Sequence, residues 1–558
     1  PPEGGALSAE LWGLNLMLQT AITQYRPECR KNLLDPHLPR WYRPSSSVVS
    51  ALLVRSSFTR LERHGRFHGV DTAHLPPVLW QGGSMTHMHV AGSVHADVAS
   101  PSPTWLTVPA DVNSLDRELW STTVTRNEQG ALEVGGVSVV ELAQQQGTAL
   151  YVLDEEDFRA RATSFRQAFD GWDVYYAGKA FLTRAIAGWV HDLGLCMDVC
   201  TSGELVTALE GGMDPERIGM HGNNKSVDEL RLALNSGVGR VIVDSLDEID
   251  RIEQLCRELD CTARVMVRVT PGVEAHTHEY IATAHEDQKF GFSIANGAAM
   301  VAMVRCFSSP VIDLVGVHSH IGSQIFDTGG FEVAARRTMK LLAQFQQATG
   351  HVLPELDLGG GFGIAYTCQD TPSTPSQLAH DLTEIVELEA RARNLSVPHL
   401  SIEPGRAIVG PTTLALYTVG TVKPVDLDGG AQRVYVSVDG GMSDNIRPAL
   451  YAAEYSAVLA NRRSQRSAVL CRVVGKHCEG GDIVVRDVYL PADVRPGDLI
   501  AVPGSGAYSR SMASNYNHVP RPSVVSVRGG TCHTLLRRET IDDLLALDAG
   551  AVVTRVDR

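Results

Sequence analysis

The chain has no long hydrophobic run, and its few cysteines follow no regular framework. No apolar stretch approaches the roughly 20 residues that a helix needs to cross a bilayer, so we expect no membrane partner. Ten cysteines in 558 residues indicate reduced intracellular thiols rather than a disulfide scaffold. Cys196 and Cys200 have no second pair beside them, which argues against a structural zinc site. We therefore expect a cytoplasmic protein without a metal.

An excess of positive charge is also missing. The formal net charge of −15 at pH 7 argues against nucleic acid and anionic membranes as main partners. The first 84 residues differ from the rest, with nine Lys/Arg against six Asp/Glu. They show no hydrophobic periodicity and no secretory signal, and their acidic residues count against an Arg-rich transit peptide. We interpret residues 1–101 as a poorly ordered N-terminal extension, with Met85 and Met88 as candidate start sites.

From about residue 149 the chain alternates β-type runs with helix-type segments. This alternation predicts parallel strands with crossover helices. If the first run is an entry strand, eight remain, which predicts a (β/α)8 TIM barrel over residues 155–411. An open doubly wound sheet is the alternative. The predicted strands are 149–154, 173–180, 195–201, 217–223, 240–245, 263–270, 313–322, 354–360 and 399–405.

After residue 411 the pattern changes to β-rich segments separated by Gly and Asp turns. Few helix signals occur there, so we predict a second, mainly antiparallel β domain. We assign residues 102–154 and 412–558 to this domain and expect the run "EVGGVSVVEL" (133–142) to join its sheet. The predicted fold class is therefore α/β, a barrel with a second β domain.

Polar residues stand at the C-terminal ends of the predicted barrel strands, where the active site of such a barrel lies. A single lysine at a strand end is more often merely solvated. Lys179 in "DVYYAGKAFLTRAI" therefore indicates a functional site only if other functional residues accompany it. The residues at the eight strand ends are Lys179, Asp198, His221, Asp244, Arg268, His320, Gly359 and Glu403.

Two motifs near these ends suit an anion and a nitrogen heterocycle. In "LDLGGGFG" (356–363), bare backbone N–H groups after an apolar strand can form a phosphate cradle, although a tight turn is the plain alternative. In "SIEPGRAIVG" (401–410), Glu403 can hold a ring nitrogen protonated and Arg406 can bind phosphate or carboxylate. A surface ion pair would explain Glu403 and Arg406 equally well if they stood alone.

Histidines occur in two further segments. In "VHSHIGSQ" (317–324), His318 and His320 lie on opposite faces of a strand; one imidazole can stack on a planar cofactor and the other is a packed core residue. A second cluster of His276, His278 and His285 has no organised acidic partner. We interpret it as a loop that closes over the site rather than as a metal centre.

Together these parts suit pyridoxal 5'-phosphate. A lysine amine, a phosphate loop, a stacking histidine and a strand-end glutamate are the groups that hold this cofactor. Each is weak alone, but their occurrence at successive strand ends is much less expected by chance. The substrate is then a small amino acid.

From about residue 102 to its C-terminus the chain resembles the fold-type III decarboxylases that depend on pyridoxal phosphate, and within them the diaminopimelate decarboxylase family. The resemblance implies a barrel plus a β domain, and an enzyme that decarboxylates meso-2,6-diaminopimelate to L-lysine and carbon dioxide, the last step of lysine biosynthesis. The motifs are "YYAGKAF", "DVCTSGEL", "HGNNKS", "HSHIGSQIFD", "LDLGGGFGI", "EPGRAIVGP", "DGGMSDNIRPALY", "GKHCEGGD" and "GAYSRSMASNYN".

The resemblance also implies roles for single residues. Lys179 is expected to form the Schiff base, His320 to stack on the ring and Glu403 to pair with the pyridine nitrogen. Cys478 is the second expected catalytic residue, and either it or Lys179 returns the proton to Cα. The other expected cofactor residues are Asp198, Ser323, Gly360, Gly361, Gly405, Arg406 and Tyr508, and the expected substrate residues are Arg406, Arg447, Tyr451, Glu479 and Tyr508.

The resemblance implies, too, a homodimer in which Cys478 and Glu479 enter the partner subunit's site. Three positions depart from the family pattern, namely Gly480, Ser509 and Arg510. They lie beside expected substrate or interface positions, so they bear on substrate choice more than on cofactor binding.

Three alternatives remain in view. An ornithine or arginine decarboxylase would favour an acidic pocket for the distal cation of its substrate. Arg447 and Tyr451 argue against such a pocket. A racemase usually places an arginine opposite the pyridine nitrogen. Glu403 takes that place here, which disfavours a racemase. A non-catalytic homologue would be expected to lack Lys179 or Cys478, and both are present.

Overall fold

The computed structural model describes residues 102–273, 289–427 and 431–550. The N-terminal extension expected over residues 1–101 lies outside the described residues. So does the loop cluster of His276, His278 and His285. Neither prediction is tested by the structure.

Eight parallel strands close into a barrel. Each strand pairs with the next along the chain, and the last, β13, pairs back with the first, β5. A short strand, β10 (Phe292–Ser293), adds to the end of β9. Because the sheet closes, the predicted barrel is confirmed and the open doubly wound sheet is wrong. The strands are β5 (Asp173–Ala177), β6 (Cys196–Val199), β7 (Ile218–Met220), β8 (Arg240–Val243), β9 (Ala263–Thr270), β11 (Ile312–Ser319), β12 (Glu355–Asp357) and β13 (His399–Ile402).

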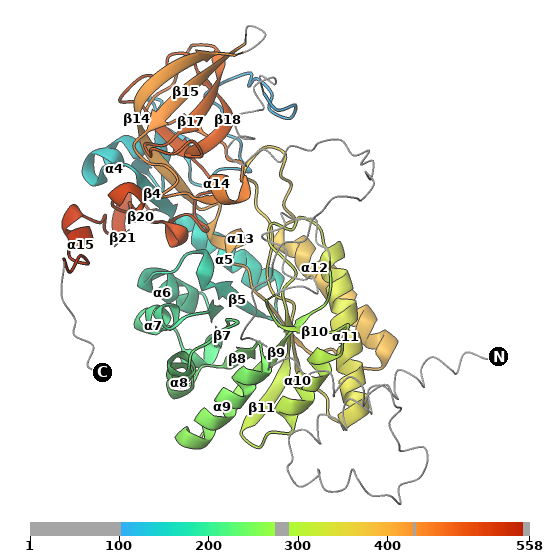
Figure 1. Ribbon diagram of the computed structural model, residues 1–558. Coiled ribbons are helices and arrows are strands. Elements are labelled where there is room, and N and C mark those ends of the chain that lie inside the picture. The colour runs from blue at the N-terminus through green and yellow to red at the C-terminus, as the bar shows by residue number, and fades with distance from the viewer. Residues whose placement is uncertain (1–101, 274–288, 428–430, 551–558) are drawn as a thin grey trace, which may run out of the picture. The chain divides into compact units, whose positions relative to one another are not determined.

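Helices connect the strands and surround the barrel (Figure 1). Several begin at a hydroxyl side chain that accepts a backbone N–H of the first turn, as Thr183, Thr201, Ser226 and Ser245 do. Such caps fix where each helix starts relative to the preceding strand end. The helices are α5 (Glu155–Ala168), α6 (Arg184–Asp192), α7 (Ser202–Glu210), α8 (Val227–Ser236), α9 (Leu246–Leu259), α10 (Ala298–Phe307), α11 (Gly329–Thr349) and α12 (Pro375–Arg393).

The second sheet is mainly antiparallel, which confirms the predicted β domain. Its order is β18-β17-β15-β14-β4-β20-β21; β19 pairs with β14, and β16 pairs with β19. The entry strand β4 pairs antiparallel with β14 and parallel with β20, so the segment before the barrel belongs to this sheet. The strands are β4 (Leu150–Asp154), β14 (Thr413–Asp426), β15 (Gln432–Val438), β16 (Val458–Leu459), β17 (Ala468–Val474), β18 (Ile483–Pro491), β19 (Leu499–Val502), β20 (Ser523–Arg528) and β21 (Thr531–Leu536).

The run "EVGGVSVVEL" does not join that sheet as a strand. It forms β2 (Leu132–Val134) and β3 (Val137–Ser138), which make a separate three-stranded sheet with β1 (Thr125–Arg126), and it continues as helix α4 (Val139–Gln146). Gly135 and Gly136 have positive φ angles, so they form a tight hairpin turn rather than extended strand. The apolar side chains still pack against strands of the large sheet in one core, which includes Leu414 and Val525.

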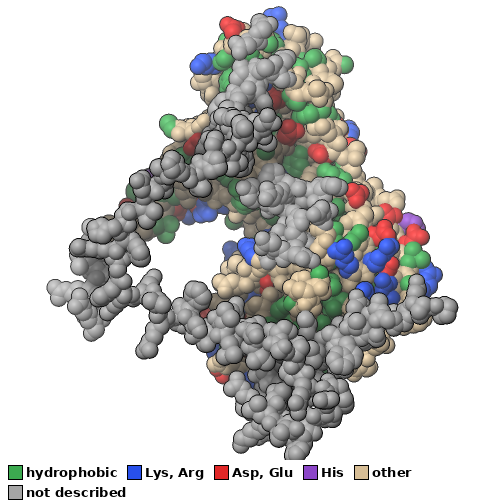
Figure 2. Space-filling view, turned by 45° about the vertical axis from the view of Figure 1, so that its right-hand side comes forward, with side chains coloured by type: hydrophobic (Ala, Val, Ile, Leu, Met, Phe, Trp, Pro, Cys, Tyr) green, Lys and Arg blue, Asp and Glu red, His purple; other side chains and the backbone are tan. Residues whose placement is uncertain are grey.

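The outer surface carries charges of both signs. Figure 2 shows Lys and Arg side chains beside Asp and Glu side chains on one face. Ion pairs on the barrel helices include those of Arg336 with Glu332 and Glu389. In the part of the chain that the structure describes, no helix is both long and apolar enough to span a membrane.

Candidate active site

Lys179 stands where β5 ends, in a single 3-10 turn (Gly178–Ala180). Lys179 is exposed although its two neighbours are buried. A Cβ on Gly178 would lie 2.8 Å from the Asp198 carbonyl oxygen, so the turn passes close to β6. The packed residues around Lys179 would lower its pKa by desolvation, but the neighbouring side chains of Tyr508, Glu403 and Asp198 outweigh this effect, and the pKa lies above its usual value.

Glu403 follows β13 and is buried between two imidazoles. Its Oε1 lies 2.9 Å from Nε2 of His318 and 3.4 Å from Nε2 of His221. Burial alone would raise the pKa of Glu403, but the imidazoles and Lys179 outweigh burial, so the pKa lies well below its usual value. Among the described residues, none donates a well-aligned hydrogen bond to this Oε1. The carboxylate is therefore held in its ionised form by two imidazole neighbours.

Asp198, at the end of β6, approaches the same group. Its Oδ1 lies 3.1 Å from Nε2 of His221. Burial, together with the charges of Glu403 and Asp357, raises the pKa of Asp198 well above its usual value, and burial lowers the pKa of His221. The floor of the site is thus one contiguous set of carboxyl and imidazole groups, of which Glu403 is the one held ionised.

The three glycines after β12 form a turn that packs too closely against its neighbours to leave room for side chains. A Cβ on Gly360 would lie 2.2 Å from the carbonyl oxygen of Glu403, and one on Gly361 would lie 2.4 Å from that of Gly322. The backbone of this turn therefore touches the segments that follow both β13 and β11. Two of its N–H groups already have acceptors, because that of Gly359 donates to Oδ1 of Asp357 at 2.7 Å and that of Gly360 to Nδ1 of His320 at 3.3 Å. Among the described residues only the Gly361 N–H of this turn is left for an anion at the barrel end.

His320 lies directly after β11 and differs from its neighbour His318. His318 is 1% exposed and approaches Glu403, whereas His320 is only partly buried and its Nδ1 accepts the Gly360 N–H at 3.3 Å. Burial lowers the pKa of His320 well below its usual value, so its ring is neutral at pH 7. A neutral ring at this place is suited to stacking on a planar ligand.

Arg406 begins the short helix α13 (Arg406–Val409), directly after Gly405. A Cβ on Gly405 would lie 2.8 Å from that of Ala177, so Arg406 is held close to the end of β5. Its guanidinium donates to Oγ of Ser323 at 2.8 Å and to Oη of Tyr366 at 2.5 Å. Its Cζ also lies 4.7 Å from the ring centroid of Tyr508.

Tyr508 joins the β domain to this end of the barrel. Its backbone N–H donates to the Ala180 carbonyl at 3.0 Å, beside Lys179. Its φ of +60° is uncommon for a tyrosine, and such strain is often found at functional sites.

Arg447 starts helix α14 (Arg447–Tyr451) and is 6% exposed. It donates a short hydrogen bond to Oη of Tyr455, and its Cζ lies 4.6 Å from the Tyr366 ring centroid. Tyr451, at the end of the same helix, is partly buried. Among the described residues neither Arg406 nor Arg447 forms an ion pair with a carboxylate, so two buried cations share one cluster of tyrosines.

Cys478 and Glu479 lie elsewhere. Both are exposed on the loop between β17 and β18. In the described parts of the chain, no hydrogen bond or ion pair joins either side chain to the barrel site. Their neighbour His477 is buried and contacts Oγ of Ser443 and Oδ1 of Asn517 at 2.9 and 3.0 Å, so the loop is anchored although its tip is free.

The structure therefore brings most of the expected site residues together through direct contacts. Sequence reasoning missed the supporting residues. It gave no role to Tyr366 and Tyr455, and it left His318 as a packed core residue. The motif "HGNNKS" contained His221 and Lys225, but nothing in its spacing showed that His221 reaches Glu403 or that Lys225 is buried against Glu248 at 2.7 Å.

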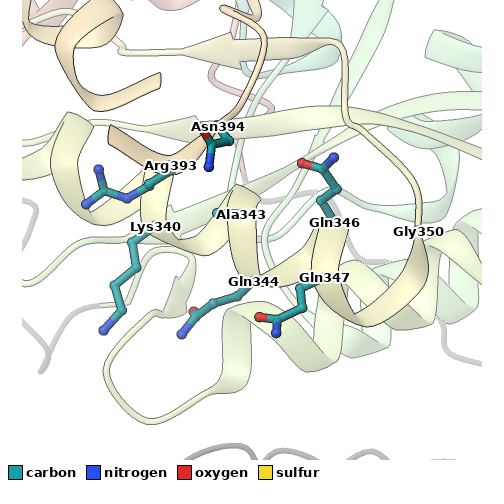
Figure 3. Close-up of a pocket in the computed structure, with 8 residues that line it drawn as sticks. All are labelled: Lys340, Ala343, Gln344, Gln346, Gln347, Gly350, Arg393 and Asn394. Atoms are coloured by element: carbon teal, nitrogen blue, oxygen red, sulfur yellow. The ribbon is translucent and has the colours of Figure 1, made fainter. Parts of the chain in front are cut away.

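His221, His318 and Glu403 also place one possible metal-ligand atom each within 4.8 Å of the others. The direct approach of imidazole to carboxylate explains this spacing, because an ionised buried carboxylate needs such neighbours. A pocket of about 510 Å³ lies on the barrel exterior between the C-terminal ends of α11 and α12 (Figure 3). Its lining includes Lys340 and Arg393 but no carboxylate, histidine or cysteine, and it contains none of the expected site residues.

These residues fit pyridoxal phosphate. An exposed lysine, an ionised carboxylate and a close-packed glycine turn, all at one end of the barrel, are groups that this cofactor needs. Lys179 would attach it, Glu403 would face its ring nitrogen, and the glycine turn with Ser323 would hold its phosphate.

Comparisons with known proteins agree with this chemistry. Residues 155–410 match the family described as pyridoxal-dependent decarboxylase, pyridoxal binding domain. The diaminopimelate decarboxylase of Mycobacterium tuberculosis is 52% identical over 438 residues, which cover 77% of this chain and 97% of that protein. The enzyme of the same name from Bacillus subtilis is 46% identical over 76% of this chain and 97% of that protein.

Solved structures give the same result. Diaminopimelate decarboxylase from M. jannaschii in complex with L-lysine superposes with a TM-score of 0.72 at 31% identity, covering 77% of this chain and 99% of that one. The Helicobacter pylori enzyme with L-lysine gives 0.67 at 30% identity, covering 73% and 98%. The chain belongs to the diaminopimelate decarboxylases, within the pyridoxal-dependent decarboxylases.

Proposed function

We propose that the barrel end built around Lys179 and Glu403 decarboxylates meso-2,6-diaminopimelate to L-lysine and carbon dioxide. The observation that carries this proposal is the pair of buried guanidiniums, Arg406 and Arg447, without a carboxylate partner among the described residues. Buried charges are normally paired, so this cluster is complementary to an anionic ligand. A substrate with a second amino-acid centre supplies a distal carboxylate for it.

Each residue then has a defined task. The cofactor, when bound, accepts the electron pair that the departing carboxylate leaves behind. Lys179 would attach the cofactor, Glu403 would keep its ring nitrogen protonated, and His320 would cover the ring face. Tyr508, between Lys179 and Arg406, would contact both cofactor and substrate.

The substrate's distal end is assigned to Arg406, Arg447 and Tyr451. Leaving the guanidiniums unpaired is unfavourable, so a substrate without a distal carboxylate, such as ornithine, is rejected. Glu479 is assigned to the distal amino group, which it binds as an ion pair.

We further propose that the functional unit is a homodimer with shared sites. Cys478 and Glu479 are exposed and lie on a loop whose base is anchored by His477, which suits them to a site on a second copy. There Cys478 is a candidate to return the proton to Cα. The substrate contacts would then be completed only on association.

Absorbance and product release test the assignment. The purified protein with pyridoxal phosphate should absorb at about 420 nm, and Lys179→Ala should abolish the band. Carbon dioxide release should be fastest from meso-diaminopimelate when it is compared with ornithine and arginine. A colourless protein, or preference for ornithine or arginine, would contradict the proposal.

Subunit mixing tests the shared site. Lys179→Ala and Cys478→Ala should each be nearly inactive, but mixing them should restore about a quarter of wild-type activity, because half of randomly formed dimers carry one intact site. A mixture as inactive as its components would contradict the shared arrangement.

A further inference from the structure

Tyr366 lies between the two buried guanidiniums and contacts each in a different way. Its Oη accepts a hydrogen bond from Nη1 of Arg406 at 2.5 Å. Its ring lies 4.6 Å from Cζ of Arg447, within cation–π range. Arg406 comes from the barrel end of β13 and Arg447 from the β domain, so Tyr366 contacts one guanidinium from each of them.

Tyr366 is itself firmly held. Its backbone N–H donates to Oδ2 of Asp370 at 2.9 Å, and its carbonyl accepts from Oγ of Ser456 at 3.1 Å. The ring packs edge-on against Tyr455, with centroids 5.0 Å apart and an interplanar angle of 71°. With an exposed fraction of 6%, the ring has little room to rotate away from either arginine.

Two nearby guanidiniums repel each other and would drift apart if only flexible stems held them. A carboxylate binds a guanidinium through directional paired hydrogen bonds, so both cations must keep a fixed spacing and tilt. An aromatic ring face is electronegative, and a hydroxyl oxygen accepts a charged donor, so one tyrosine can stabilise both cations at once.

We propose that Tyr366 is a specificity-determining residue that fixes Arg406 and Arg447 in the geometry that binds the substrate's distal carboxylate. This rests on the proposed function, because it concerns the recognition of the same substrate. Tyr366 acts through the arginines and takes no part in bond breaking. Its loss should therefore weaken substrate binding and leave the chemical step largely intact.

Two substitutions separate the hydroxyl from the ring. Tyr366→Phe keeps the ring face for Arg447 and removes the acceptor for Arg406, so the KM for meso-diaminopimelate should rise about tenfold, or about 1.4 kcal/mol. Tyr366→Leu removes both contacts and should raise KM about a hundredfold. In both variants kcat and cofactor loading, followed by absorbance, should stay within about twofold of wild type.

Two product-like inhibitors distinguish a specific loss of carboxylate binding from a general loss of packing. L-lysine keeps the distal carboxylate of the substrate, whereas cadaverine has none. The inhibition constant of L-lysine should rise in step with KM, and that of cadaverine should change by less than about twofold. Tyr435→Leu is the matched control, because Tyr435 lies 5.9 Å from Cζ of Arg472 in the outer part of the β domain.

An unchanged KM, an equal weakening of L-lysine and cadaverine, or a fall in kcat alone would each overturn the role of Tyr366. If the wild type itself binds no pyridoxal phosphate and releases no carbon dioxide from meso-diaminopimelate, the proposed function fails and this role fails with it. If the wild type is active and the Tyr366→Phe variant has the same KM as the wild type, the proposed function stands and only the role of Tyr366 is refuted.

Discussion

Substituting Gly360 by alanine should weaken cofactor binding through steric contact alone. The added Cβ would lie 2.2 Å from the Glu403 carbonyl oxygen, about 1.2 Å closer than the 3.4 Å at which ordinary contact begins. Gly360 has no positive φ angle, so alanine suits the backbone and only the close approach is perturbed. The turn must move away from β13, and it takes with it the N–H that His320 accepts.

The magnitude follows from overpacking of a tight interior, which costs about 1–3 kcal/mol. If the bound state needs the tight turn and the free protein can relax, the Kd for pyridoxal phosphate should rise about 5- to 150-fold. Isothermal titration of the apoprotein measures this directly, and a Tm scan shows whether folding is retained.

A matched control is Gly203→Ala, in α7, where a Cβ would meet nothing closer than 3.8 Å. That variant should bind the cofactor as the wild type does. A Gly360→Ala protein with unaltered Kd would refute the argument that the turn and Glu403 are packed in contact. Loss of folding without a change in the affinity of the folded fraction would support the tight packing but refute its link to cofactor binding.

Three further predictions concern the surroundings of the site. Glu403→Gln should lower kcat about 10²- to 10³-fold with a small change in cofactor Kd, because a neutral amide cannot keep a ring nitrogen protonated; an unaltered kcat would contradict this. His477→Ala removes the contact with Ser443 and should lower kcat about tenfold while the absorbance near about 420 nm stays; loss of the absorbance instead would show a different role. Burial raises the pKa of Asp444 from 3.8 to about 6, so the folded protein binds this proton more tightly than the unfolded chain. Its contribution to the free energy of unfolding is therefore full below about pH 4 and falls by about 3 kcal/mol as the pH rises to about 6; Asp444→Asn should flatten the fall in Tm over this range, and an equal slope would contradict the assignment.

The barrel was predictable because its signal is local and repeated. Each strand is a short apolar run bounded by polar residues, and most of the helices between them show their own periodicity and a capping side chain. The ends of parallel strands must then meet on one side, which places Lys179 and Glu403 near each other without knowledge of any contact. The resemblance to a family added the substrate residues, whose segments lie far apart in the sequence.

The supporting contacts were not predictable in the same way. Tyr366 reaches Arg447 across 81 positions of sequence, and a tyrosine after a glycine-rich turn has no pattern that sets it apart from a core residue. His318 was assigned to the core, which its burial matches, but its closeness to Glu403 depends on how β11 and β13 are rotated in the closed sheet. The run 133–142 had strand-like composition throughout, and only the paired glycines indicated a hairpin turn.

The unpaired arginine cluster has a practical consequence for handling the protein. A site that concentrates positive charge in a sheltered place will take up sulfate, phosphate or citrate from a buffer. We expect such ions to raise the melting temperature and, through the substrate role proposed for these arginines, to compete with substrate, so an apparent KM measured in phosphate should be too high. Zwitterionic buffers with chloride as the counter-ion avoid this, and the difference between the two media is itself a measure of how strongly the cluster attracts anions.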